Sequence, residues 1–377
     1  MAKPLTIGVD MRDLKVAKTG TRTYLLELCR EFKQMQSPEL KFEFIDTHLP
    51  IYTGNNKLLK WAEHVNYQLW KQVILPVKAC GKRCDIVFCT DNFVPLVHLG
   101  YKTIPVFHDA FFFETPENYG KLWLWLYKKT ALPAARRSPV IITPTAYSKK
   151  QLQHFTGIPA EQLAVVFEGA RHQEKEYSEE DLEALELPIS SKNYLMHAGS
   201  FFKRKNIPML IQAFAKVKVE GYPDLKLVLA GPLPVNKAEN DYREVIDAIE
   251  QYNLSNDLVL TGYLSDAHLQ LLYKHALLYV FPSVNEGFGL PVLEAFSNDL
   301  PVVVANNTCL SEVGGDAVLS FDPFDSDAIA TAIKNVLDDK DLREGMIEKG
   351  RERLKQFSWT QTAEQLVVIF KKAANYS

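Results

Sequence analysis

The sequence predicts an α/β protein built from two doubly wound parallel sheets. Short apolar runs rich in Val, Ile and Phe recur between helix-like stretches, and this series starts a second time after a polar interval. Such runs are typical of strands that are buried on both faces of a parallel sheet. Their alternation with helices indicates repeated βα units. With 377 residues, the chain is long enough for two domains of ordinary size.

The two series of runs set the expected domain limits. The charged stretch 171–192 separates them and is typical of a linker. We therefore expect domains at 1–186 and 187–357, with a final helix at 358–377 that joins the first. The expected strands are 5–9, 41–46, 85–89, 103–107, 140–143 and 163–167, and then 194–199, 225–231, 258–262, 277–283, 301–305 and 317–321.

Composition excludes several classes of protein. A net charge of −3 provides no positive field that would attract nucleic acid, so no nucleic-acid partner is expected. No apolar run is long enough for a signal peptide or a membrane span, which predicts a cytoplasmic protein. Five cysteines in such a chain indicate reduced thiols. Cys80, Cys84 and Cys89 lie close in sequence but lack a convincing fourth ligand, so we expect no metal site.

The stretch FPSVNEGFGLPVLEAF (281–296) is the most informative part of the second half. It follows an expected strand and leads into an expected helix. Gly287 and Gly289 allow a sharp turn and a close approach of the backbone to a ligand. Pro291 suits the first position of a helix. The free N–H groups and the positive dipole of that helix start would suit a phosphate.

Two glutamates flank this turn. Glu294 is expected in the first helical turn, where its carboxylate would accept hydrogen bonds from two neighbouring hydroxyls such as a ribose diol. Glu286, at the entrance of the loop, would reach another part of the same ligand. The alternative is that both glutamates only favour a helix N-terminus.

A basic trio precedes another expected helix. Lys203, Arg204 and Lys205 follow the strand that ends at Gly199. Cations there would neutralise a diphosphate and stabilise it as a leaving group. Most such trios are solvated loops, but open α/β sheets bind ligands at the carboxyl ends of their strands.

On these motifs, the stretch from Gly262 to Pro323 resembles the donor domain of retaining glycosyltransferases of the GT-B fold. It most resembles the large family four group, whose glutamate, seven residues, glutamate pattern is matched by Glu286 and Glu294. Lys205 matches the family's basic residue, with Arg204 as its partner. The resemblance is strong over 194–324 and looser before that. It implies the GT-B architecture, in which two Rossmann-like domains face a central cleft.

The resemblance also implies a role for each residue. Glu294 would hold the ribose hydroxyls, Glu286 would contact the sugar, and Lys205 and Arg204 would bind the diphosphate. Tyr263 would lie near the base. The chain departs from the family at SNDLPVV, where Asp299 replaces a small-residue glycine turn, and we expect a changed turn there. The backbone that would contact the sugar and phosphates comprises Gly287, Phe288, Gly289 and Leu290.

Two motifs in the first half resemble the same family. His108 follows the expected strand 103–107, and in the family this histidine contacts the donor sugar; Asp109 would orient it or only cap the next segment. Gly20 resembles the family's N-terminal glycine loop near the donor phosphates and the acceptor. Gly20 with Thr21 is also an ordinary arrangement before a helix. We expect Glu286, His108 and Lys205 to be the catalytic residues, and Gly20 to belong to the substrate-binding set.

Two aromatic stretches, 58–72 and 121–129, mix Trp, Tyr, Leu and Lys. Either stretch would rest on a membrane surface or hold a lipid-linked or polysaccharide acceptor. The alternative is packing between helices, and the second stretch is apolar on every face, which favours burial. The cytoplasmic protein expected above could therefore also lie at the inner face of the membrane through a peripheral contact, and this location stays open.

The resulting hypothesis is a retaining transferase that moves a hexose-type sugar, of the mannose, glucose or GlcNAc class, to a hydroxyl acceptor. The donor would be a nucleoside diphosphate sugar, with UDP or GDP preferred, and the acceptor a saccharide or lipid-linked saccharide. No cofactor and no metal are expected, because the cations and the helix dipole would stabilise the leaving group. The alternatives are an epimerase or phosphorylase of the same fold, or a non-catalytic sugar-nucleotide binding protein.

Overall fold

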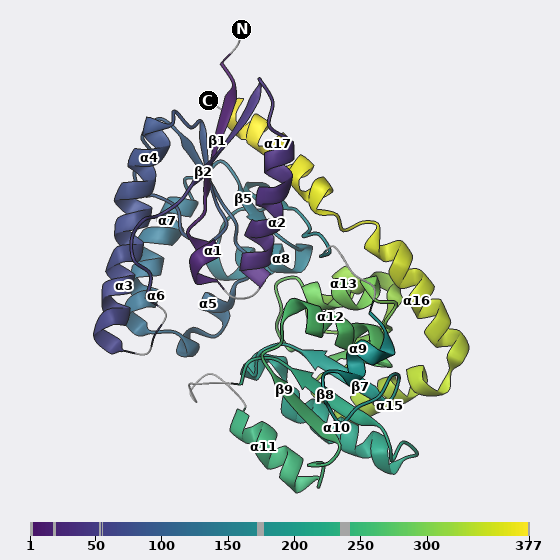
Figure 1. Cartoon of the computed structure of the whole chain (residues 1–377). Coiled ribbons are helices and arrows are strands. Elements are labelled where there is room, and N and C mark those ends of the chain that lie inside the picture. The colour runs from purple at the N-terminus through teal and green to yellow at the C-terminus, as the bar shows by residue number, and fades with distance from the viewer. Residues whose placement is uncertain are drawn as a thin grey trace. The chain divides into compact units, whose positions relative to one another are not determined.

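The structure is a computed structural model (Figure 1) that describes residues 3–17, 20–52, 54, 56–171, 177–233 and 242–375. These residues form two compact units. Unit 1 combines the residues up to Gly169 with those from Ser358 on, and unit 2 runs from Ala170 to Phe357.

Unit 1 contains a parallel sheet with the strand order β2-β1-β3-β4. A parallel bridge between Val106 and Ile142 leads on to the parallel pair β5-β6. The order reverses direction between β1 and β3, as in a doubly wound sheet. The strands are β1 (Leu5–Asp10), β2 (Leu40–Ile45), β3 (Ile86–Cys89), β4 (Lys102–Pro105), β5 (Ile141–Thr143) and β6 (Leu163–Val165).

The helices of unit 1 cover this sheet (Figure 1). One long helical stretch changes from α-helix to a π-turn and back, through α3, η1 and α4. The α-helices are α1 (Asp13–Val16), α2 (Gly20–Gln34), α3 (Lys57–Leu69), α4 (Leu75–Gly81), α5 (Phe111–Glu114), α6 (Lys121–Leu126), α7 (Leu132–Ala135), α8 (Ala146–Thr156) and α17 (Trp359–Asn375). The π-turns are η1 (Trp70–Ile74) and η3 (Tyr127–Ala131), and the 3-10 turns are η2 (Pro116–Asn118) and η4 (Ala160–Gln162).

Unit 2 contains one six-stranded parallel sheet with the order β12-β11-β10-β7-β8-β9. This is the Rossmann order, and its direction reverses between β7 and β10. The strands are β7 (Tyr194–Ala198), β8 (Lys226–Ala230), β9 (Leu258–Gly262), β10 (Leu278–Phe281), β11 (Val302–Ala305) and β12 (Val318–Phe321). The α-helices are α9 (Glu179–Glu183), α10 (Ile207–Val219), α11 (Tyr242–Gln251), α12 (Asp266–His275), α13 (Leu290–Ser297), α14 (Leu310–Gly314), α15 (Ser326–Asp338) and α16 (Lys340–Leu354), and the 3-10 turns are η5 (Lys203–Lys205) and η6 (Gly315–Ala317).

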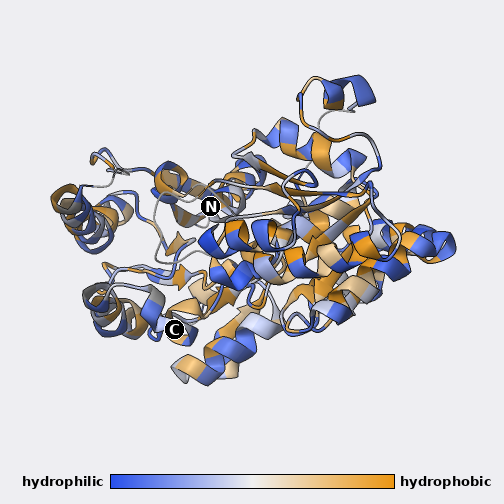
Figure 2. Cartoon of the chain, turned by 90° about the horizontal axis from the view of Figure 1, so that it is seen from below, coloured by the Kyte–Doolittle hydropathy of each residue, from blue (hydrophilic) through white to orange (hydrophobic). Residues whose placement is uncertain are grey.

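Every strand expected from the sequence occurs, within two residues at each end. The reason is that these runs are buried: every residue of β3, β7, β10 and β11 is inaccessible to solvent or nearly so. Figure 2 shows hydrophobic colour along the strands and hydrophilic colour on the outer faces of many helices.

The chain leaves unit 1 at Gly169 rather than at the expected position 186. The second part of the charged stretch belongs to unit 2, because α9 packs on α12 and buries Leu182. The backbone N–H of Lys192 also donates to the carbonyl of His275, 2.8 Å away. Residues 172–176 lie outside the described part of the chain.

The final helix α17 belongs to unit 1, as its sequence position at 358–377 suggested. Its Phe370 contacts the rings of Phe32 and Phe88, and Trp359 is almost fully buried. At Asp299, where we expected a changed turn, the backbone is left-handed (φ 55°), and the Asp299 carboxylate pairs with Arg351 at 2.7 Å. This aspartate therefore keeps the backbone conformation that a glycine would adopt most easily.

Candidate functional site

The first candidate site lies at the switch point of the unit 2 sheet. Adjacent strands β7 and β10 meet there. Lys205 follows β7 in the short turn η5, and Glu286 follows β10 in the loop before α13. Open α/β sheets bind ligands at the carboxyl ends of the strands beside such a reversal. The two sequence motifs, which are far apart in the chain, are therefore brought together.

Lys205 and Glu286 form a nearly buried ion pair, with 2.5 Å between Nζ and Oε1. The Lys205 ammonium also lies 5.0 Å from the centre of the Phe281 ring. Burial and the nearby Arg204 lower the pKa of Lys205, against the attraction of Glu286. For Glu286, burial disfavours the charge, but Lys205 and Arg204 outweigh it and lower the pKa. The carboxylate is therefore ionised at neutral pH.

Arg204 adds a second positive charge beside this pair. Its guanidinium lies 4.8 Å from the centre of the Phe202 ring. Its backbone carbonyl accepts a hydrogen bond from the N–H of Val284 at 2.8 Å, which connects the loop after β7 to the loop after β10. Lys205 and Arg204 both lower the pKa of Glu286, so two cationic side chains lie close to this carboxylate.

The glycine turn before α13 has the expected geometry, with one difference. Gly289 adopts a left-handed backbone (φ 106°), which an L side chain adopts only with strain. The Cys309 thiol lies 3.1 Å from the carbonyl of Glu286 and 3.2 Å from that of Phe288, and so holds the turn from below. The helix begins at Leu290, which makes Pro291 its second residue rather than its first.

Glu294 is the fifth residue of α13, so it lies just past the first turn in which it was expected. Burial raises the pKa of its carboxyl, while Arg171 and a hydrogen bond from Tyr273 act in the opposite direction. Tyr263 follows β9 at the edge of the sheet and is 75% exposed. Because β8 separates β9 from β7, the structure does not bring Tyr263 to the ion pair.

His197, at the end of β7, was not singled out in the sequence. Its Nδ1–H donates to the carbonyl of Val280 at 3.0 Å, while the buried Nε2 has no partner among the described residues. Burial, together with Lys205, lowers the pKa of His197 to about 4, so the ring is neutral. A lone histidine inside an apolar strand gives no sequence signal, because its role depends on the neighbouring strand.

Unit 1 has its own pocket of about 420 Å³ at the carboxyl ends of β1, β3 and β4. One wall is aromatic and the other is charged or polar. The aromatic wall consists of Tyr67, Phe93, Phe112, Tyr119 and Trp123. The polar wall includes Arg12, Asp13, Glu63, His64, Thr90, Asp91, His108 and Asp109, and Thr21 also lines the pocket.

Beneath the pocket, Lys71 is buried between two carboxylates. Its Nζ lies 2.6 Å from Asp10 and 2.5 Å from Asp91. Burial disfavours the ammonium, but the two aspartates outweigh it and raise the pKa of Lys71 well above its usual value. Trp70 also donates to Asp10 at 3.0 Å, and Tyr67 donates to Asp91 at 2.5 Å.

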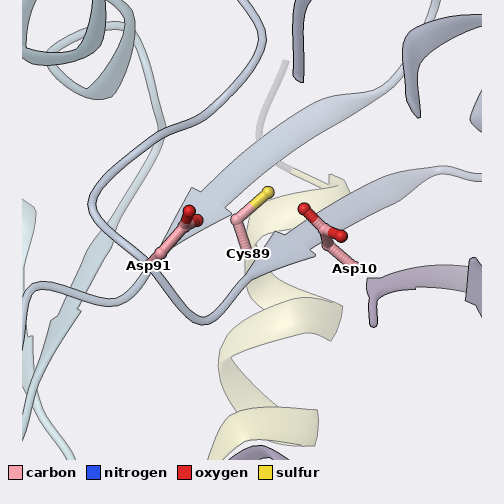
Figure 3. A group of neighbouring side chains, drawn as sticks. All are labelled: Asp10, Cys89 and Asp91. Carbon is pink, nitrogen blue, oxygen red and sulfur yellow. The ribbon is translucent and has the colours of Figure 1, made fainter. Parts of the chain in front are cut away.

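The same aspartates, together with Cys89, form the one group among the described residues with the spacing of a metal site (Figure 3). The Lys71 ammonium already supplies a cation to both carboxylates. Burial raises the pKa of the Cys89 thiol well above its usual value, which disfavours the thiolate form. This cluster therefore fits a lysine better than a metal ion. Cys80 and Cys84 are not part of it.

Arg12 and Asp13 extend from β1 into the pocket. The Arg12 guanidinium pairs with Glu63 of α3 and lies 4.8 Å from the centre of the Tyr67 ring. Burial and the nearby Asp91 raise the pKa of Asp13 to about 7. A carboxyl that changes its charge near neutral pH therefore faces the pocket.

His108 lines the pocket, but both of its ring nitrogens have partners within unit 1. Nε2 lies 3.0 Å from the carbonyl of Thr90, and Nδ1 lies 3.3 Å from the Glu168 carboxylate. Both partners can accept hydrogen bonds. The two ring nitrogens can both donate only when the ring is protonated, so these partners favour the imidazolium form. Burial works against that charge, but the hydrogen bond to Glu168 outweighs it and raises the pKa of His108.

Gly20 is the first residue of α2 and is exposed, while its neighbour Thr21 lines the pocket. Most pocket residues were not predicted from the sequence. The sequence did offer one signal for them: DMRD lies at the end of β1, and Thr90 and Asp91 follow β3. Polar residues at the ends of buried parallel strands collect at one edge of the sheet, where ligands bind.

Comparison with known proteins places the chain in a family. The model of the family Glycosyl transferases group 1 matches residues 152–353. O-antigen chain mannosyltransferase B from Escherichia coli is 31% identical over 293 residues, which cover 76% of this chain and 74% of that protein.

Two solved structures share the fold. Sucrose-phosphate synthase from Thermosynechococcus elongatus has a TM-score of 0.74 and 17% identity, covering 99% of this chain and 100% of that one. HepE from Anabaena in complex with UDP and glucose has a TM-score of 0.71 and 18% identity, covering 98% of this chain and 100% of that one. The chain belongs to the family Glycosyl transferases group 1 and is a glycosyltransferase of GT-B architecture.

Proposed function

We propose that the protein is a retaining hexosyltransferase of polysaccharide or glycolipid synthesis. It transfers a sugar of the mannose, glucose or GlcNAc class from a UDP- or GDP-sugar to a hydroxyl of a saccharide or lipid-linked saccharide. The similarity to an O-antigen mannosyltransferase supports this acceptor class. The HepE complex, which holds UDP and glucose, supports a nucleotide-sugar donor.

The single observation that best supports the donor assignment is the ion pair between Lys205 and Glu286 at the unit 2 switch point. Arg204 adds a second cationic side chain close to Glu286, in the region that leads to the start of α13. A diphosphate that binds at this point would accept hydrogen bonds from Lys205 and from the backbone of the glycine turn. These groups stabilise the negative charge that grows on the leaving diphosphate during transfer.

The acceptor takes the pocket of unit 1 in this proposal. An aromatic wall opposite charged hydrogen-bonding groups suits a sugar ring, which has apolar C–H faces and hydroxyl edges. The cations at the pocket are paired with carboxylates, Lys71 with Asp10 and Asp91 and Arg12 with Glu63, so the pocket does not favour a second phosphate-rich ligand.

The chemical route needs no protein nucleophile. The leaving diphosphate accepts the proton of the acceptor hydroxyl on the same face of the sugar, so the configuration at the anomeric carbon is retained. His108 is held at the pocket by hydrogen bonds to Thr90 and Glu168, and Glu168 favours its protonated form by raising its pKa. The residues Lys205 and Arg204 supply the cationic charge that a metal ion would otherwise supply, so we propose that transfer proceeds without one.

A thermal-shift screen with UDP-, GDP-, ADP- and dTDP-sugars tests the donor site. A ligand that binds only the folded state raises the melting temperature. We expect one donor class to give the largest shift and Glu294→Ala to abolish it. Glu244→Ala, an exposed glutamate in the first turn of α11, is the matched control and should keep the shift. Full binding by Glu294→Ala together with Lys205→Ala would refute the site.

Two other functions would give different results in the same system. An epimerase would isomerise the donor without an acceptor, and a phosphorylase would require phosphate as a co-substrate. A binding protein would show a thermal shift but no slow hydrolysis of the donor. We expect donor hydrolysis without acceptor to be slow, and transfer to a saccharide acceptor to proceed with retained configuration by NMR.

A further inference from the structure

A stripe of apolar side chains runs along the outside of the long helical stretch α3–η1–α4 in unit 1. Its residues are 41% to 80% exposed, although large apolar side chains are usually buried in a soluble protein. The stripe comprises Leu58, Trp61, Val65, Leu69, Val73 and Val77. Among the described residues, no helix has the length and apolar character that crossing a bilayer requires.

The π-turn keeps this stripe on one side of the helix. From Trp61 to Val77 its members follow one another every four residues, and in a regular α-helix each such step drifts by roughly 40°. The wider turn at Trp70–Ile74 takes up part of this drift. On the opposite side, Trp70, Lys71 and Leu75 of η1 and α4 are buried, whereas the inner residues Glu63 and Tyr67 of α3 are half-buried. The stripe is therefore a continuous apolar band roughly 30 Å long.

The charge around the stripe is positive. Between Asn56 and Arg83 the sequence contains one acidic residue, Glu63, and its carboxylate is paired with Arg12. Lys60, Lys82 and Arg83 are exposed on the same stretch, although Lys82 also pairs with Glu43.

A neighbouring helical stretch has the same character. Tyr67 of α3 packs against the aromatic cluster that contains Trp123 and Tyr127, so α6–η3 lies beside α3 (Figure 1). Its Trp125 is 56% exposed, and the sequence from Lys121 to Arg137 contains no acidic residue. The exposed lysines there are Lys121, Lys128 and Lys129.

We propose that the stripe is the surface on which the protein lies against an anionic lipid bilayer. Apolar side chains on one helix face, flanked by lysines and arginines, match the chemistry of the headgroup boundary. A second copy of the chain fits less well, because a two-fold contact would place the same cations against one another. The proposal rests on the proposed function, since it identifies the partner that presents a lipid-linked acceptor.

Docking by this surface would place the acceptor pocket close to the lipid headgroups. Glu63 and Tyr67, which line the pocket, are on the inner side of the helix that bears the stripe. A helix with its side chains is about 10 Å thick, so the pocket would open near the headgroup layer. A saccharide attached to a lipid would thus reach the pocket without leaving the membrane.

Vesicle sedimentation tests this proposal with the full-length protein. We expect binding to vesicles of phosphatidylcholine with phosphatidylglycerol, weak binding to phosphatidylcholine alone, and release at high salt. The double variant Val65→Glu/Val73→Glu should reduce binding about tenfold, because it adds two anions to the stripe. Val219→Glu, at an 88% exposed position of unit 2, is the matched control and should bind as the wild type does.

The outcomes separate docking from catalysis. Transfer to a water-soluble acceptor without vesicles should be equal in the double variant and the wild type. If the double variant binds anionic vesicles as tightly as the wild type, or the wild type does not bind them, the docking surface is refuted while the transferase assignment stands. If sedimentation velocity shows a dimer that only the stripe variant dissociates, with vesicle binding unchanged, the stripe is an interface between copies instead.

Discussion

Both units place a buried lysine beside the switch point of their sheet, but its surroundings differ. In unit 1, Lys71 is held by two carboxylates, Asp10 and Asp91, and its pKa is raised. In unit 2, Lys205 has one carboxylate, Glu286, and a neighbouring arginine, and its pKa is lowered. The first lysine lies between two carboxylates, whereas the second shares one carboxylate with a neighbouring arginine.

This difference indicates how one kind of fold can serve two ligands. A lysine whose charge is fully opposed stabilises the base of a pocket and leaves a weakly charged wall for hydroxyl groups. A lysine that shares one carboxylate with an arginine still attracts an anion. We therefore expect the ratio of cations to carboxylates at the reversal to distinguish a unit that binds a diphosphate from one that binds an acceptor.

The largest expected effect is on stability, from Lys71→Met. It leaves Asp10 and Asp91 buried without a cation, and breaking such a pair costs about 3–5 kcal/mol. The free energy of unfolding in urea should fall by that amount. Lys60→Met, at an exposed position of the same helical stretch, should change it little. Equal stability of the two variants would contradict the structural role of Lys71.

Lys205→Met makes the same substitution in unit 2 and should mainly affect donor binding. We expect affinity for the best nucleotide sugar to fall roughly 100-fold, because a close charged contact with the diphosphate is lost. Isothermal titration calorimetry measures this loss. Lys203→Met, at the exposed first residue of η5, is the control. A loss of stability without any loss of affinity would show that the two lysines have the same role.

His108→Ala should keep donor binding and lose most turnover, roughly 10- to 100-fold, the size expected for one hydrogen-bonded charged group. It removes the imidazole ring that links Thr90 to Glu168. Initial rates with saturating donor measure the effect, and His154→Ala on α8 is the control. Unchanged turnover would remove His108 from the catalytic residues.

The smallest expected effect is a pH dependence of acceptor affinity. The pKa of Asp13 is raised to about 7 by burial and by Asp91 and Asp10, against Lys71 and Arg12, so its ionised form is lost as the pH falls through that value. We expect the KM for the acceptor to rise a few-fold between about pH 8 and pH 6.

The variant Asp13→Asn separates this titration from that of His108, which lines the same pocket. It should give a KM that no longer follows pH, whereas a pH profile identical to the wild type would assign the titration to another group. A change in KM without a change in kcat would indicate an effect on acceptor binding, whereas a fall in kcat as well would indicate a general loss of structure.

Much of the fold followed from local pattern. The buried runs of Val, Ile and Phe predicted each strand because a parallel sheet with helices on both faces leaves those residues no access to water. The glycine turn was predicted for a similar reason: the φ of 106° at Gly289 favours a residue without Cβ. The domain limit at 186 was wrong because Leu182, inside a charged stretch, is buried against α12.

The sequence by itself determined the two βα series and the glycine turn before α13, and it predicted Lys205 and Glu286 as candidate site residues, because these depend on neighbours along the chain. Only the tertiary structure decided that Lys205 pairs with Glu286, that Lys71 joins Asp10 to Asp91, and that Tyr263 lies away from the ion pair. Those facts depend on strand order, which brings together residues that are distant in sequence. Strand order therefore decides which charged side chains surround Lys71 and Lys205, and so which kind of ligand we expect each unit to suit.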